Sequence, residues 1–281
     1  MLEYKTCETA WCPGCGNFVI LDCLKTALEE LAKKPQEVVL VAGIGQAAKI
    51  PQYLNVNAFC GLHGRALPPA AAIKMANDKL TVIVSTGDGD TYGEGGNHFI
   101  HNIRRNTNIT HFVHDNQIYG LTKGQASPTS QMGFISGIQP DGNVNAPINP
   151  LLLAISAGAG FVARGFTGKR RQLIDLMKAA ITYKGYALLD IYQPCVTFNK
   201  VNTFQWYNKR VYELDESYDP SNKLKAMEKV MESDENIPIG IIYQEEKAIF
   251  SENNEVLKHH PVLVDRKNDV KVVEKIMQEY I

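Results

Sequence analysis

The sequence predicts an α/β fold: a mainly parallel sheet with helices on both faces, followed by an irregular C-terminal extension. Two observations favour this fold class. Short β-branched runs alternate with amphipathic segments of helix length, and several of these runs end in glycine or aspartate. Such alternation implies right-handed crossovers and a sheet covered on both sides. The chain has 281 residues, 44% of them hydrophobic and 21% charged, which suffices for a sizeable core and excludes a mainly disordered protein.

The expected elements follow one another along the first 195 residues. Apolar residues at helical spacing predict helices over residues 17–31, 67–76, 95–105, 151–157 and 169–182. Short apolar runs predict buried strands over residues 37–42, 80–85, 110–114, 161–163 and 187–192. The stretch 124–150 is rich in Gly, Pro, Ser and Thr, and is expected to be a loop.

The alternation ends near residue 195. Beyond it lie an aromatic and polar stretch, a helix-like segment over 222–231 and a strand-like segment over 238–243. We therefore expect one α/β domain over residues 1–195 and an extension over residues 196–281.

Charge and cysteine content narrow the class of protein. Lys plus Arg number 29 and Asp plus Glu 30, so electrostatics give no reason to expect nucleic acid or an anionic membrane as a partner. The sequence contains no apolar run of about 18 residues and no signal-peptide pattern at its start. We expect a cytoplasmic protein whose six cysteines are ligands, reactive thiols or core residues rather than disulfides.

The tetrapeptide Gly87-Asp88-Gly89-Asp90 follows an expected strand, at the edge where parallel sheets bind ligands. Glycines there let a diphosphate approach the backbone, and a carboxylate beside it needs a divalent cation between the two. Asn116 follows the next strand and supplies a second oxygen ligand at the same edge. An ordinary turn is the alternative, and the Asn116 spacing favours a Mg²⁺ site. No Gly-x-Gly-x-x-Gly opens a helix after a strand, so a nicotinamide site fits poorly.

The unit Cys12-Pro13-Gly14-Cys15 forms a tight turn just before the first helix. Such a turn converges two thiolates on a metal or iron–sulfur centre, although a redox dithiol is equally open. Cys23 lies within the helix and is expected in the core. His98 and His101 are one helical turn apart, which suits packing better than a metal pair.

The stretch from Gly87 to Asn116 matches the thiamine diphosphate motif of enzymes that use this cofactor. Further blocks are more specific: Gly43-Ile44-Gly45, Gly61-Leu62-His63-Gly64-Arg65-Ala66-Leu67-Pro68, Gly95-Gly96-Asn97-His98-Phe99-Ile100-His101 and Pro194-Cys195-Val196-Thr197-Phe198-Asn199. Together they resemble the β subunit of 2-oxoacid:ferredoxin oxidoreductases, over roughly 70% of the chain.

The resemblance implies oxidative decarboxylation of a 2-oxoacid to acyl-CoA and CO₂, with electrons passed through an iron–sulfur centre to ferredoxin. The implied cofactors are thiamine diphosphate, Mg²⁺ and a [4Fe–4S] cluster. The implied partners are an α subunit, further iron–sulfur subunits, ferredoxin, the 2-oxoacid and coenzyme A. The α subunit would carry the glutamate that activates the cofactor, and residues 196–281 would pack on that subunit.

Site residues follow from the same resemblance. Asp88, Asn116 and the carbonyl of Ile118 would hold Mg²⁺. The cofactor would be lined by Gly45, Gln46, His63, Arg65, Gly87, Asp88, Gly89, Asp90, Asn116, Ile118, Tyr119, Gly120, Leu121 and Thr122. His63 is the expected catalytic side chain facing the cofactor, while Lys49 and Lys123 would pair with the carboxylate of the 2-oxoacid. A solvated surface charge is the alternative for both lysines.

The iron–sulfur ligands are incomplete. Cys12, Cys15 and Cys195 match three ligands of the family, but the fourth follows Gly-Ile-Gly, where this chain has Gln46. Three outcomes stay open: a cluster with a non-cysteine fourth ligand, Cys60 as that ligand, or no cluster. Without a cluster the chain would serve a thiamine-diphosphate-dependent decarboxylase or ligase. A non-catalytic subunit is a third hypothesis, disfavoured by the intact Asp88 and Asn116 pair.

Overall fold

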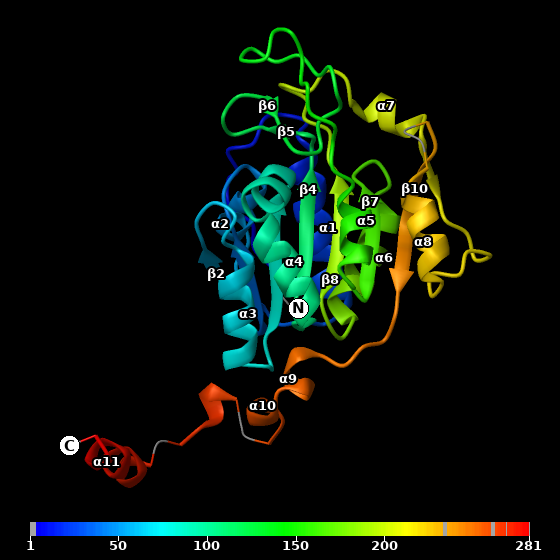
Figure 1. Ribbon diagram of the computed structural model, residues 1–281. Coiled ribbons are helices and arrows are strands. Elements are labelled where there is room, and N and C mark those ends of the chain that lie inside the picture. The colour runs from blue at the N-terminus through cyan, green and yellow to red at the C-terminus, as the bar shows by residue number, and fades with distance from the viewer. Residues whose placement is uncertain (1–3, 233–234, 260–261, 268, 281) are drawn as a thin grey trace.

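A mainly parallel sheet of eight strands forms the centre of the computed structural model, which describes residues 4–232, 235–259, 262–267 and 269–280 (Figure 1). The strand order is β2-β1-β3-β4-β8-β7-β10-β9. Its strands are β1 (Val38–Ala42), β2 (Asn57–Cys60), β3 (Thr81–Gly87), β4 (Thr110–Asp115), β7 (Phe161–Phe166), β8 (Ala187–Tyr192), β9 (Val211–Glu213) and β10 (Ile237–Gln244). A separate hairpin joins β5 (Ile118–Tyr119) and β6 (Gln125–Ala126).

Helices cover both faces of this sheet. The described helices, including those that lie beyond the sheet, are α1 (Gly16–Glu30), α2 (Ile50–Tyr53), α3 (Leu67–Ala76), α4 (Gly96–Arg105), α5 (Pro150–Ser156), α6 (Arg170–Thr182), α7 (Phe204–Asn208), α8 (Lys223–Val230), α9 (Phe250–Asn253), α10 (Glu255–His259) and α11 (Val270–Gln278). None of the described helices is both long enough and apolar enough to cross a membrane.

The predicted fold class is confirmed, and each predicted helix and strand of the first 195 residues occurs within a few residues of its expected position. The strand predicted over 161–163 is longer, because Arg164–Phe166 is also buried and continues the pairing with β8. Two strands run against the others: β10 is antiparallel to β7, and β9 is parallel to β10.

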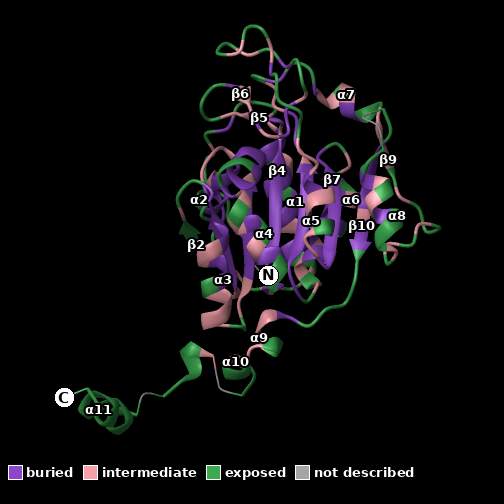
Figure 2. Cartoon of the chain, viewed as in Figure 1, coloured by how far each residue is buried: buried purple, intermediate pink, exposed green. Residues whose placement is uncertain are grey.

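Two hydrophobic cores lie on the two faces of the sheet. Successive residues of a strand point to opposite faces, so Leu40 belongs to the core under α1 and α6, whereas its neighbour Val41 packs beneath α3 and α4. Phe112 and Val113 of β4 divide in the same way. Figure 2 shows the central strands as the most continuous buried part of the chain. This double burial explains why the strands read as near-continuous apolar runs.

The sheet crosses the predicted boundary at residue 195. β9 and β10 both come from the predicted extension, and they complete the sheet beside β7. Beyond β10 the chain leaves the sheet, and Figure 1 shows α9, α10 and α11 running away from it. In α11 none of the described residues is buried. Within the predicted extension, the described part after β10 therefore stands outside the α/β layers.

Candidate active site

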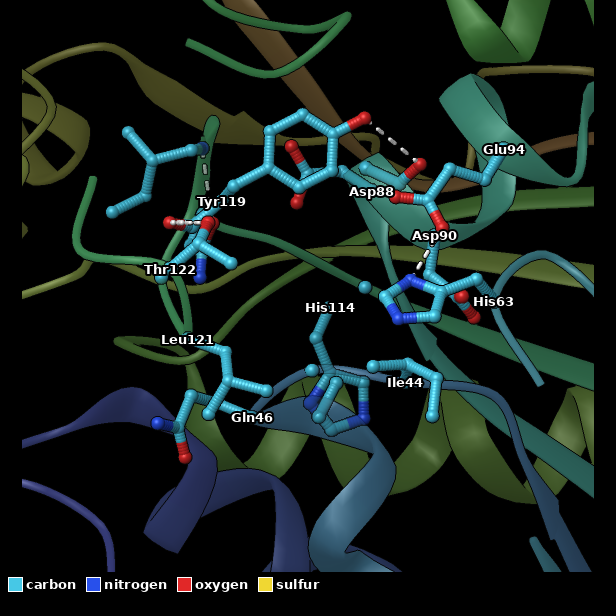
Figure 3. A pocket seen from close by; sticks show the side chains of 17 residues that line it. Ile44, Gln46, His63, Asp88, Asp90, Glu94, His114, Tyr119, Leu121 and Thr122 are labelled. Carbon is cyan, nitrogen blue, oxygen red and sulfur yellow. Dashed lines mark hydrogen bonds and ion pairs between the residues drawn. The ribbon is translucent and has the colours of Figure 1, made fainter. Parts of the chain in front are cut away.

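Two neighbouring strands, β3 and β4, end side by side at the carboxyl edge of the sheet. Gly87 at the end of β3 pairs with His114 of β4, and Asp88 and Asn116 follow directly. They border a cavity with about 550 Å³ of empty space, which we call the first cavity. Its lining comprises Ile44, Gly45, Gln46, Ala47, His63, Gly87, Asp88, Gly89, Asp90, Glu94, His114, Asn116, Ile118, Tyr119, Gly120, Leu121 and Thr122 (Figure 3).

Asp88 is buried at the base of the first cavity and is held by two hydroxyl groups. Ser127 and Thr129 donate to its Oδ2 atom at 2.5 and 2.7 Å. Burial raises the pKa of Asp88 to about 6, and the two hydroxyls oppose that rise. A buried carboxylate oriented in this way is a suitable ligand for a hard cation.

Asn116 is held by hydrogen bonds to its side chain and to its backbone. Its Oδ1 atom accepts a hydrogen bond from the Ile118 backbone N–H at 3.0 Å, and its carbonyl accepts one from Asn199 Nδ2 at 3.2 Å. Gln117 adopts a left-handed conformation, with φ at 57°, which turns the chain sharply between β4 and β5. The turn brings Asn116 and Ile118 to the same cavity.

Glycines shape the first cavity in two opposite ways. An added Cβ at Gly45 or at Gly87 meets no atom within 4 Å, so the backbone there borders open space that a diphosphate can approach. At Gly43 a Cβ would lie 1.9 Å from Asp90 Oδ2, and at Gly89 it would lie 2.3 Å from Tyr119 Cε1. Gly45 and Gly87 therefore leave room for a ligand, whereas Gly43 and Gly89 allow the side chains of Asp90 and Tyr119 to pack against the backbone.

His63, Asp90 and Glu94 form a cluster on one side of the cavity, where Figure 3 shows them together. His63 Nδ1 lies 2.6 Å from Glu94 Oε2. Asp90 Oδ1 accepts from the Gly64 backbone N–H at 2.7 Å, while its buried Oδ2 has no partner among the described residues. Burial raises the pKa of Asp90 to about 6. Glu94 is the cavity carboxylate that the sequence reasoning missed.

A buried acidic network supports the floor of the cavity. Thr129 donates to both Asp88 and Asp115, and Tyr92 donates to Asp190 Oδ2 at 2.6 Å. Burial raises the pKa of Asp115 well above its ordinary value, and the nearby Asp190 raises it further. Burial raises the pKa of Asp190 to about 6, and the buried Arg164 guanidinium opposes part of that rise.

Three predicted contacts do not line the first cavity. Lys49 is half-buried at the end of a short 3₁₀ turn, and Lys123 is exposed on a loop. Arg65 is exposed, and its guanidinium donates to the carbonyls of His63, Gly64 and Glu94. The other predicted contacts, from Gly45 to Thr122, do line it.

A second cavity, of about 400 Å³ of empty space, brings the three predicted cluster ligands together. We call it the cysteine cavity; it is lined by Trp11, Cys12, Cys15, Asn17, Gln46, Asn116, Gly120, Gln193, Cys195, Val196, Thr197 and Phe198. The Cys15 backbone N–H closes the turn onto the Cys12 carbonyl at 3.0 Å. Burial raises the pKa of the Cys15 thiol, and the nearby Cys195 and Cys12 raise it further.

The remaining sequence candidates lie elsewhere. Cys60 is exposed on the edge strand β2, and neither it nor Cys7 lines the cysteine cavity. Cys23 is fully buried, so its prediction as a core residue is confirmed. Within the described ranges, His63, Asp90 and Glu94 are the one group of three or more ligand side chains whose ligand atoms all lie within 4.8 Å of one another, and His98 and His101 are not part of it.

Family models match two adjacent parts of the chain. Residues 36–191 match the thiamine pyrophosphate enzyme C-terminal TPP-binding domain, and residues 195–259 match the C-terminal part of the pyruvate ferredoxin oxidoreductase β subunit. The first match contains β1 to β8 and all residues of the first cavity.

Relatives agree with these matches. The chain is 49% identical to the 2-oxoacid:ferredoxin oxidoreductase subunit β of Saccharolobus solfataricus, covering 84% of this chain and 82% of that protein. It is 43% identical to the subunit of the same name from a Sulfolobus species, covering 94% and 91%. Among solved structures, the 2-oxoglutarate:ferredoxin oxidoreductase of Magnetococcus marinus, with 2-oxoglutarate, coenzyme A and succinyl-CoA bound, aligns with a TM-score of 0.89. Its sequence identity is 35%, and 97% and 94% of the two chains are covered.

Proposed function

The chain belongs to the β subunits of the 2-oxoacid:ferredoxin oxidoreductases, and from this membership we propose that its first cavity is the magnesium–diphosphate half of the active site. An α subunit would complete the site and would supply the glutamate that activates the cofactor. Thiamine diphosphate, when bound, supplies the carbanion chemistry by which a 2-oxoacid loses CO₂. Coenzyme A would receive the acyl group, and ferredoxin the electrons.

One observation carries this proposal: Asp88 and Asn116 emerge from adjacent strand ends beside the open backbone of Gly45 and Gly87. Asp88, Asn116 and the Ile118 carbonyl would hold Mg²⁺, since carboxylate and amide oxygens are its preferred protein ligands. The donors on Asp88 support this role, because both hydroxyls bind the same oxygen and orient the carboxylate.

His63 would hold or move a proton at its Nε2 atom. Since Nδ1 lies against the Glu94 carboxylate, the proton on Nδ1 is shared with Glu94 and Nε2 is left to act toward the cavity. Lys49 and Lys123 would attract the substrate carboxylate once the α subunit closes the mouth of the site. Arg65, which braces the loop around His63, would face the cofactor from its rim.

Cys12, Cys15 and Cys195 would bind an iron–sulfur cluster that accepts electrons from the first cavity. The two cavities share a wall, since Gln46, Asn116 and Gly120 line both. A shared wall of this kind keeps an electron donor and its acceptor within a short distance.

A second candidate function is favoured by a specific residue. Gln46 stands where the family has its fourth cysteine ligand, so a thiamine-diphosphate-dependent decarboxylase or ligase without a cluster is the alternative. Reduction of ferredoxin or a viologen by the purified heteromer, supplied with a 2-oxoacid and coenzyme A, separates the two functions. The panel should include 2-oxoglutarate, the compound bound in the Magnetococcus relative.

The proposed cofactor site is tested on the heteromer, purified anaerobically after co-expression with its α subunit. Thiamine diphosphate should raise the melting temperature only when Mg²⁺ is present, because Asp88 and Asn116 would hold the cation that neutralises the diphosphate charge. The Asp88→Ala heteromer should show no such rise. A Mg²⁺-independent rise in the wild type would contradict the proposed ligand set.

A further inference from the structure

The lining of the cysteine cavity contains two amide oxygens without partners among the described residues. Oε1 of Gln46 and Oε1 of Gln193 are both buried, and neither accepts a hydrogen bond within the described part of the chain. Both side chains line the cysteine cavity. A buried acceptor without a donor costs about 1–3 kcal/mol, so such atoms point to a missing ligand.

The position of Gln46 is set by its backbone. Trp11 Nε1 donates to the Gln46 carbonyl at 2.9 Å, and the preceding Gly45 has φ at 107°, which side chains rarely permit. In Figure 3 the amide of Gln46 points away from Asp90 and Glu94. The residue at position 46 is therefore presented to the cysteine cavity by fixed backbone geometry.

Gln193 has a different role in the lining of the cysteine cavity. Its Nε2 atom donates to Cys15 Sγ at 3.4 Å, which orients that sulfur and supports a thiolate. Phe198 contributes a similar contact, its backbone N–H lying 3.5 Å from Cys195 Sγ. Two of the three sulfurs thus have a donor, as sulfurs that carry cluster charge generally do.

Iron in sulfide clusters prefers thiolate to a neutral amide oxygen, which is a hard and weak donor. Three cysteines can hold three irons firmly, and the fourth iron would face Gln46 with an oxygen ligand only. Cys60 does not line the cavity and gives no thiolate there. The fourth iron would consequently be the most weakly held.

Building on the proposed function, we propose that the cysteine cavity holds a cluster with one exchangeable iron, opposite Gln46. Three irons are bound by Cys12, Cys15 and Cys195. The fourth leaves as Fe²⁺ when the [4Fe–4S]²⁺ cluster gives one electron to an added one-electron oxidant, and [3Fe–4S]⁺ remains. Reduction by one electron in the presence of Fe²⁺ restores the original cluster, so charge and atoms balance in both directions.

The experiment compares three heteromers purified anaerobically: wild type, Gln46→Cys and Cys12→Ser. Each is treated with ferricyanide and desalted, and iron, sulfide and the EPR spectrum are measured. The wild type should lose about one iron per β chain without losing sulfide, and should gain the signal of an oxidised three-iron cluster. Dithionite with Fe²⁺ should reverse both changes. Gln46→Cys should resist the loss, because the fourth iron gains a thiolate.

Cys12→Ser identifies the cluster that gives the signal, since any other iron–sulfur subunit is unchanged in this variant. The three-iron signal should be absent from it. Cys60→Ser is the matched control and should behave as the wild type; if it abolishes the cluster, Cys60 is a ligand and the inference is wrong.

The two proposals fail in different ways. If the wild type binds four irons that resist ferricyanide as firmly as in Gln46→Cys, the exchangeable iron is refuted while the cluster stands. If the wild type and Cys12→Ser carry the same iron and sulfide, this cavity holds no cluster and the iron–sulfur part of the proposed function also fails. Thiamine diphosphate binding is unaffected by either result.

Discussion

The first cavity and the cysteine cavity share a wall, but they differ in how completely the chain itself satisfies the hydrogen bonds of the groups that line them. In the first, Asp88 has two hydroxyl donors, Asn116 is fixed by backbone contacts, and glycines lie where a ligand needs space. In the second, the sulfurs have few donors and two buried amide oxygens have none. Hydrogen bonds alone can prepare a site for a cation and a diphosphate, whereas a cluster site is completed by its inorganic core.

The strongest test of the prepared cavity replaces its central carboxylate. Asp88→Asn keeps the acceptor for Ser127 and Thr129 but removes the charge. We expect Mg²⁺-dependent affinity for thiamine diphosphate to fall by about a hundredfold, roughly 2.7 kcal/mol. Titration calorimetry on the heteromer measures this loss. Asp22→Asn, an exposed carboxylate on α1, is the control and should bind normally.

Two glycine variants distinguish space that the ligand needs from space that the packing of the protein needs. Gly89→Ala places a Cβ 2.3 Å from Tyr119 Cε1 and should destabilise the chain by about 1–3 kcal/mol. Gly87→Ala meets no atom, so the melting temperature should hold while cofactor affinity falls about tenfold. Equal melting temperatures for the two variants would contradict this distinction.

One buried histidine should make part of the chain's stability sensitive to acid, while the raised pKa values of Asp88, Asp90 and Asp190 act in the opposite direction. His111 is fully buried, hydrogen-bonded to Thr86 and Tyr186, and burial lowers its pKa to about 3. Its stabilising contribution is complete above pH 6.5, where the unfolded imidazole is also neutral, and is lost as the pH falls toward 3. The loss at pH 5 is about 2 kcal/mol.

Urea midpoints at pH 7 and pH 5 measure this effect. His111→Gln should raise the midpoint at pH 5 relative to the midpoint at pH 7, because one buried imidazole no longer titrates. An unchanged difference would show that the loss comes from other groups, among them His114, whose pKa burial also lowers to about 3.

The smallest expected effect concerns the carboxylate beside His63. Glu94→Gln keeps the shape but removes the charge that holds Nδ1–H. Since both side chains are substantially exposed, we expect kcat to fall by about fivefold, near 1 kcal/mol. The melting temperature and the KM for the 2-oxoacid should not change. Glu29→Gln, on exposed α1 surface, is the control for steady-state assays.

Sequence reasoning succeeded where local pattern and sheet geometry coincide. Asp88 and Asn116 follow apolar runs, and parallel strands bring their carboxyl ends to one edge, so their meeting was predictable. The contacts of Ser127 and Thr129 with Asp88 could not be predicted, because the polar composition of a loop does not indicate which carboxylate it will contact. A Ser-Pro-Thr-Ser stretch after a strand end is the only local signal they give.

Other misses have equally specific causes. β2 is a four-residue strand whose residues are all exposed at the sheet edge, so its apolar stretch is too short to mark a buried strand. Glu94 reaches His63 because residues Gly89–Glu94 form a π-helical turn, which lacks the ordinary helical period. β10 reverses direction in the sheet, and its pairing with β7 depends on contacts distant in sequence.

The unpaired Asp90 Oδ2 and the buried Asp88 carboxylate bear on more than ligand binding. Each lowers the free energy of unfolding while no cation or cofactor is bound, because a charged group is buried without a compensating cation. Ligand that binds only the folded state adds about 2.7 kcal/mol when it exceeds its Kd a hundredfold. If the first cavity binds thiamine diphosphate and Mg²⁺ as proposed, both should lower the fraction of chains that are unfolded and open to proteases.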